Sequence, residues 1–113
     1  MLILAIGRGL IRACVSEPVL AEYHDVLFRP KFARFADDLE PLLQMMLQGA
    51  IQVDAGPSGF TSPDPDDTKF IDCAVAGDAS FLVTGNLKHF PVSVVGATKV
   101  VSSRDLLEHL ETA

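Results

Sequence analysis

Three aspartates within four positions are the first feature of this chain that suggests chemistry. Asp64, Asp66 and Asp67 belong to the stretch DPDDTKF, directly before an apolar run that begins at Phe70. Asp64 followed by Pro65 is typical of a helix N-cap and the first helical residue, so a helix is predicted to begin here. Carboxylates in a first turn are stabilised by the helix dipole, which accounts for Asp64 and Asp66 without a catalytic role.

Asp67 is less well explained by capping. It precedes Phe70 by three positions and Ala74 by seven, which places it toward the packed side of the predicted helix. A carboxylate that leans inward costs free energy unless a cation or hydrogen-bond donors accompany it. Asp67 is therefore the aspartate of this stretch that we expect to face a ligand.

Two further oxygen-bearing side chains come from other segments. Glu22 lies beside the apolar stripe of a predicted helix, and Asn86 directly follows the apolar stretch FLVTG. Oxygen ligands from separate segments are how proteins hold hard cations such as Mg²⁺ or Mn²⁺. Pattern alone gives a metal-site hypothesis for these residues and the aspartates. A residue placed like Glu22 is, taken alone, more often an ordinary residue at the boundary between a buried and an exposed face.

The elements that must position these side chains alternate between strands and helices. In chain order they are a strand over 11–15, a helix over about 18–28 capped by Ser16, a helix over about 37–48 with Pro41 near its first turn, a half-exposed strand over 50–55, a loop over 56–63, the helix that begins near 64, a buried strand over 80–86, a strand over 99–103 and a final helix over 103–110. Such alternation predicts an α/β fold with a mainly parallel sheet. Ligands bind such sheets outside the carboxyl ends of the strands, where all the candidate residues fall.

Composition narrows the classes of function. The chain has 113 residues, which suits one domain, and its net charge of −6 disfavours a general surface for polyanions. Cys14 and Cys73 lie in apolar segments without His or Cys at metal-ligand spacing, so both are predicted to be buried, reduced thiols. Apolar runs are too short to span a bilayer and a basic leader is missing, so we expect a soluble, cytoplasmic protein without a membrane partner.

Three longer motifs carry a family resemblance. The stretches VSEPVLAEYHDVLFRPKF, DPDDTKFIDCAVAGDASFLVTGN and KVVSSRDLLEHL, in this order, resemble PIN-domain proteins of the group described as toxin components of bacterial toxin–antitoxin pairs. The resemblance implies a three-layer α/β sandwich in which four acidic residues hold Mg²⁺ or Mn²⁺ for the cleavage of single-stranded RNA. It also implies an antitoxin protein as a partner.

The resemblance assigns roles to particular residues. Glu22 corresponds to the second acid of the family and Asp67 to the third, with Asp66 as a neighbour that can assist or substitute. Asn86 stands where the family often has aspartate, and its amide supplies no charge, which weakens metal binding unless Asp64 or Asp66 compensates. The expected catalytic residues are Glu22, Asp67 and Asn86, and the expected metal ligands are Glu22, Asp67, Asp66 and Asp64. Candidates for RNA contact are Arg29, Lys31, Arg34, Lys88 and His89, although solvated surface charge is the commoner role of such residues.

The chain departs from the family pattern at its amino-terminal end. Family members begin with a strand that carries the first acid, followed by a helix, and the opening LILAIGRG resembles that helix. We therefore expect an N-terminally incomplete domain that lacks its central strand. The gap would be closed by pairing of the neighbouring strands, or by a strand from another chain in a homo-oligomer. The alternatives to an active ribonuclease are a catalytically degenerate binding module and an incomplete fragment that associates with another chain.

Overall fold

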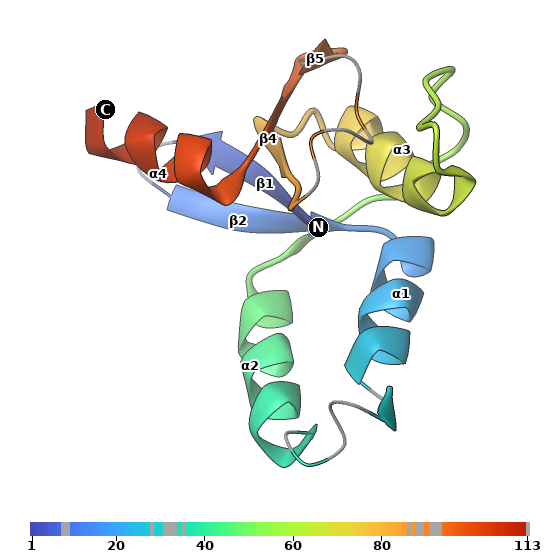
Figure 1. Cartoon of the computed structure of the whole chain (residues 1–113), viewed down its shortest axis with the longest axis vertical. Coiled ribbons are helices and arrows are strands. Elements are labelled where there is room, and N and C mark those ends of the chain that lie inside the picture. The colour runs from blue at the N-terminus through green and yellow to red at the C-terminus, as the bar shows by residue number, and fades with distance from the viewer. Residues whose placement is uncertain are drawn as a thin grey trace.

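The computed structural model describes residues 1–7, 10–27, 29–30, 34, 36–85, 87, 90 and 94–112, with the backbone alone described at 7, 10, 27, 36, 39, 42, 43 and 46. The elements in chain order are β1 (Leu2–Gly7), β2 (Leu10–Val15), α1 (Glu17–Leu27), α2 (Ala36–Gln48), β3 (Ile51–Gln52), the 3₁₀ turn η2 (Pro65–Asp67), α3 (Thr68–Ala76), β4 (Phe81–Val83), β5 (Val94–Val95), β6 (Thr98–Val101) and α4 (Ser103–Thr112). Figure 1 shows their arrangement.

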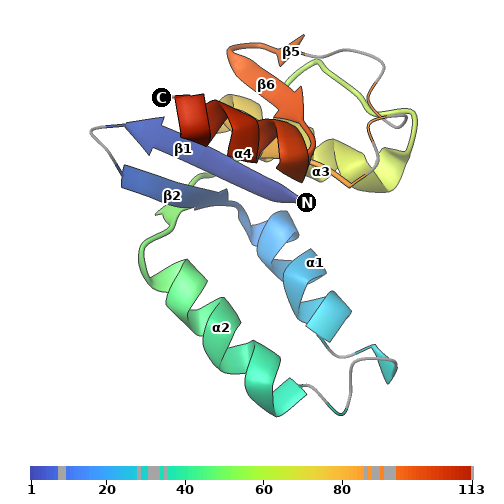
Figure 2. The same ribbon diagram turned by 60° about the vertical axis from the view of Figure 1, so that its left-hand side comes forward.

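The strands of the described residues form one sheet in the order β3-β2-β1-β4-β6-β5. β2, β3, β4 and β6 run in one direction, while β1 and β5 run against their neighbours. α3 packs on one face of the sheet and α4 lies against β4 and β6 on the other (Figure 2). The predicted three-layer α/β fold is thereby confirmed. The prediction of a mainly parallel sheet is wrong, because three of the five strand pairings among the described residues are antiparallel, two of them made by the central strand β1.

The interpretation of the opening segment as a helix is wrong. Leu2–Gly7 is a strand, and it occupies the centre of the sheet between β2 and β4, antiparallel to both. The sheet therefore has a central strand from this chain, and β2 and β4 do not pair with each other. The physical reason is that LILAIG is a short apolar run, which suits a buried strand as well as a helix, and two neighbouring strands offer it backbone partners.

Most of the other predicted elements are confirmed. Ser16 caps α1, where the amide of Val19 donates to its hydroxyl over 3.4 Å. Ser102 caps α4 in the same way, with the amide of Asp105 as donor over 3.1 Å. β4 is buried along its whole length, as its continuous apolar sequence predicts. The short β5 has no counterpart among the predicted elements.

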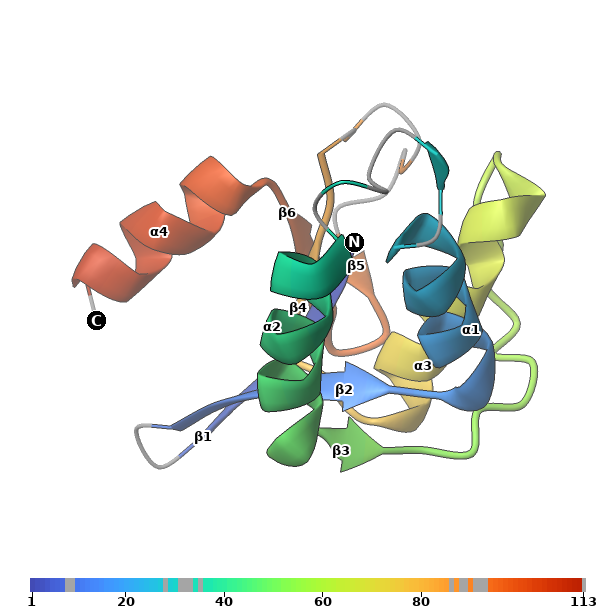
Figure 3. The ribbon, with the colours of Figure 1, turned by 90° about the horizontal axis from the view of Figure 1, so that it is seen from below.

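α1 and α2 extend together from the sheet as a pair of helices (Figures 1 and 3). Pro41 lies inside α2, further from its start than predicted. In the described part of the chain, no helix has the length and apolar character that spanning a bilayer requires.

The loop between β3 and η2 is tied to α3 by one carboxylate. Asp72 accepts hydrogen bonds from the amide of Ser58 over 3.0 Å and from its hydroxyl over 2.7 Å. Because Ser58 lies in the middle of the loop, this contact fixes the path of the chain toward the aspartates that follow.

The core lies between the sheet and α3. Ile3, Cys14, Cys73 and Leu82 are fully buried there, and both cysteines are reduced, as predicted. Gly77, which ends α3, lets the helix approach β2, because a Cβ at this position would lie 3.1 Å from the Cys14 sulfur. Gly77 is therefore required by close packing and not by its backbone conformation.

We predict that Gly77→Ala destabilises the fold. The added methyl group has to displace the Cys14 sulfur, and overpacking of this kind costs about 1–3 kcal/mol. Urea unfolding of the wild type and the variant measures the difference. Gly56→Ala is the matched control, since a Cβ there meets no atom within 4 Å. Equal unfolding midpoints for Gly77→Ala and the wild type would contradict the close approach.

We also predict a loss of stability in alkali that depends on Cys73. Burial raises the pKa of its thiol from 9.0 to about 11, with a further contribution from Cys14 and an opposing hydrogen bond from Ser16. Between these pH values the unfolded thiol releases its proton more readily than the folded one, so stability present below pH 9 declines as pH rises toward 11. Urea unfolding across this range should show a smaller decline for Cys73→Ala, and equal declines would contradict the assignment.

Candidate acidic site between α1 and α3

Glu22 on α1 and Lys69 on α3 form the central contact of the candidate site. Lys69 Nζ donates to Glu22 Oε2 over 3.1 Å. The exposed fraction of the side chain is 27% for Lys69 and 29% for Glu22. The residues that follow them also meet, since the rings of Tyr23 and Phe70 lie 6.2 Å apart. The packing of α1 on α3 therefore holds the Glu22 carboxylate against an ammonium group.

The aspartate cluster has mainly a local structural role. Asp64 is the N-cap of η2, and its carboxylate accepts the amide of Asp66 over 3.0 Å. The predicted cap is thus confirmed, although it starts a 3₁₀ turn that leads into α3. Asp66 is exposed, while Asp67 is partly buried as the N-cap residue of α3 and its side chain makes no capping hydrogen bond.

Met1 lies at the edge of the sheet where the resemblance places the first acid of the family. Because β1 runs antiparallel to β2 and β4, its amino-terminal end meets their carboxyl ends. The Tyr23 hydroxyl donates to the Met1 carbonyl over 2.8 Å. Burial, with a smaller contribution from Cys73, raises the pKa of Tyr23 above its ordinary value, so this hydroxyl stays protonated and remains a donor.

The other predicted site residues are only partly visible. Asn86, Lys31, Lys88 and His89 lie outside the described residues. Arg29 and Arg34 are exposed beyond the end of α1. The structure thus brings Glu22 close to the start of α3.

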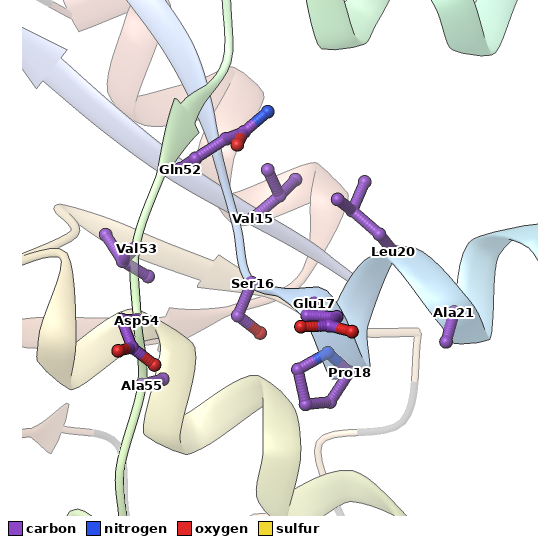
Figure 4. Close-up of a pocket in the computed structure, with 10 residues that line it drawn as sticks. All are labelled: Val15, Ser16, Glu17, Pro18, Leu20, Ala21, Gln52, Val53, Asp54 and Ala55. Carbon is purple, nitrogen blue, oxygen red and sulfur yellow. The ribbon is translucent and has the colours of Figure 1, made fainter.

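A separate pocket of about 950 Å³ lies where β2 and β3 end and α1 begins. Glu17 and Asp54 place their carboxylates along it, next to Ser16 (Figure 4). None of the predicted metal ligands lines this pocket. Its acidic lining also disfavours a phosphate group in the absence of a cation.

Those predicted site residues that the structure describes do not, as they lie, form a metal centre. In the parts of the chain that the structure describes, no group of three His, Cys, Asp or Glu side chains is arranged to hold an ion. The oxygen donors of Glu22 and Asp67 suit a hard cation chemically, but Glu22 already neutralises its charge against Lys69. The arrangement is an ion pair, with Asp67 two positions before the lysine.

Lys69 is the residue of this site that the sequence analysis did not single out. Its position two residues after Asp67 was the available signal, because a lysine in the first turn of a helix opposes the helix dipole and is stabilised by an anion nearby. The identity of that anion depends on how α1 packs against α3.

Comparison with known proteins places the chain in a family. Residues 1–88 match the PIN domain family, so the chain belongs to the PIN-domain proteins. Neither curated proteins nor solved structures gave a match. Membership in this family indicates a nuclease-type function in general, and PIN domains generally use divalent metal ions.

We predict that Tyr23→Phe destabilises the protein by about 1 kcal/mol, the typical net contribution of one hydrogen bond. The variant keeps the ring beside Phe70 and loses only the bond to Met1. Urea unfolding below pH 8 measures the effect without tyrosine ionisation. Tyr23→Leu, which also loses the aromatic contact, should cost more. An unchanged midpoint for Tyr23→Phe would show that the bond to Met1 contributes nothing to stability.

Proposed function

We propose that this chain is a PIN-type ribonuclease that hydrolyses single-stranded RNA in the presence of Mg²⁺ or Mn²⁺. The proposal is carried by the family match, which spans both α1 and the start of α3. It is supported by the contact between Glu22 on α1 and Lys69 on α3, because Lys69 lies two positions after Asp67. Glu22 and Asp67 are the proposed ligands, with Asp66, Asp64 and the amide of Asn86 as further oxygen donors.

The proposal includes the setting that the family resemblance implies. The chain would act in the cytoplasm as one PIN domain, as the toxin of a bacterial toxin–antitoxin pair neutralised by an antitoxin protein, and a homo-oligomer is the proposed assembly. RNA phosphates would be contacted by Arg29, Lys31, Lys88 and His89, since cations outside the site position the backbone of a nucleic acid.

A second candidate function is a binding module of the PIN fold without catalysis. One observation favours it specifically: the Glu22 carboxylate is neutralised by Lys69, and no three acidic side chains of the described residues converge on one point. Such a module would bind RNA or protein through its surface and would not respond to divalent cations.

The test is cleavage of a fluorescently labelled single-stranded RNA by the 113-residue chain, with Mn²⁺ and with EDTA. We expect cleavage only with the metal, and a fall of at least about a hundredfold in Asp67→Asn and Glu22→Gln, comparable to the loss of one electrostatic contributor in other active sites.

Asp105→Asn is the matched control, because Asp105 also lies in the first turn of a helix but belongs to α4. It should cleave like the wild type. Cleavage that persists in EDTA, or that is unaffected by both site substitutions, would contradict the proposed ribonuclease site. Absence of cleavage under all conditions would favour the binding module.

A further inference from the structure

Lys69 and Glu22 are held together by the packing of two helices. Glu22 belongs to α1 and Lys69 to α3, and the adjacent rings of Tyr23 and Phe70 lie 6.2 Å apart. Their side chains are about one quarter exposed, so solvent screens the pair less than it would screen a fully exposed one. The packing of α1 on α3 therefore holds this ion pair in place at the protein surface.

The pair also balances the charge of one proposed metal ligand. A carboxylate that binds a divalent cation holds it about 2.0–2.6 Å from its oxygen. Lys69 Nζ already lies 3.1 Å from Glu22 Oε2, so a cation on this carboxylate would be within a few ångströms of an ammonium group. Like charges at such separations repel, so each cation weakens the binding of the other at this carboxylate.

The lysine is able to leave. Its charge stands on a flexible stem of four carbons, and 27% of its side chain is exposed. Displacing it costs the pairing with Glu22.

We propose that Lys69 is the resident counter-ion of Glu22 and that it competes with divalent cations for this carboxylate. The inference rests on the proposed function, in which Glu22 is a metal ligand, and it adds a control on that site. Lys69 lowers the affinity of the wild-type chain for divalent cations below the affinity that the same carboxylates would have without the lysine. The charge of Glu22 stays neutralised until a cation displaces Lys69.

The test is a titration of the full chain with Mn²⁺, in which electron paramagnetic resonance measures the free ion at fixed ionic strength. Lys69→Gln should bind Mn²⁺ at least about fivefold more tightly than the wild type, since removal of a partly buried pairing and of a like charge both favour the metal. The gain should disappear in the double variant Lys69→Gln/Glu22→Gln. Lys69→Arg, which keeps the charge, should bind as weakly as the wild type.

Lys99→Gln is the matched control for net charge, because Lys99 is exposed on β6 and its removal should change the affinity less than about twofold. Far-ultraviolet circular dichroism verifies folding, and Lys69→Met serves as a second variant if Lys69→Gln is unfolded. Unchanged or weaker Mn²⁺ binding in the folded variant overturns the inference, as does undetectable binding in every protein.

This readout separates the two proposals. Tighter Mn²⁺ binding by Lys69→Gln together with an absence of RNA cleavage would support the counter-ion and overturn the ribonuclease. Metal-dependent RNA cleavage by the wild type together with unchanged Mn²⁺ affinity in Lys69→Gln would support the ribonuclease and overturn the counter-ion.

Discussion

The pairing of β1 with both β2 and β4 is the constraint on which the rest of the structure depends. A strand at the centre of a sheet must satisfy its backbone groups on both edges, and Leu2–Gly7 does so with antiparallel neighbours on either side. Ile3 of this strand is fully buried under α3, so the same segment also completes the core. Without it, β2 and β4 would each expose an unpaired edge in the middle of the fold.

The direction of β1 decides the chemistry available at the edge of the sheet. The strand brings Met1, held by Tyr23, to the place where the family resemblance expects a carboxylate. The acidic character of this region therefore rests on α1 and α3, and the packing of these helices joins Glu22 to Lys69. Membership in a family and the state of a site therefore have to be argued separately.

The acidic residues of the motif DPDDTKF divide into structural and functional candidates by their contacts. Asp64 caps the turn that precedes α3, and Asp72, further along the same helix, ties down the preceding loop. Capping and loop attachment thus account for two of the carboxylates on this segment. Asp67 begins α3 without a capping hydrogen bond, and it is the aspartate that corresponds to the third acid in the family resemblance.

The sequence by itself determined the elements whose signals are local. The Ser16 cap, the Asp64–Pro65 helix start, apolar periodicity and a continuous buried run predicted α1, α3 and β4, because these signals depend on neighbours a few positions away. The alternation of strands and helices predicted the α/β class, and the apolar pattern together with the family motifs pointed to Glu22 and Asp67. Only the tertiary structure decided that Leu2–Gly7 is a central antiparallel strand and that Lys69 neutralises Glu22. Both outcomes depend on partners distant in the chain, since an apolar run takes the conformation that unpaired strand edges offer it, and a charge takes the counter-ion that helix packing brings within reach.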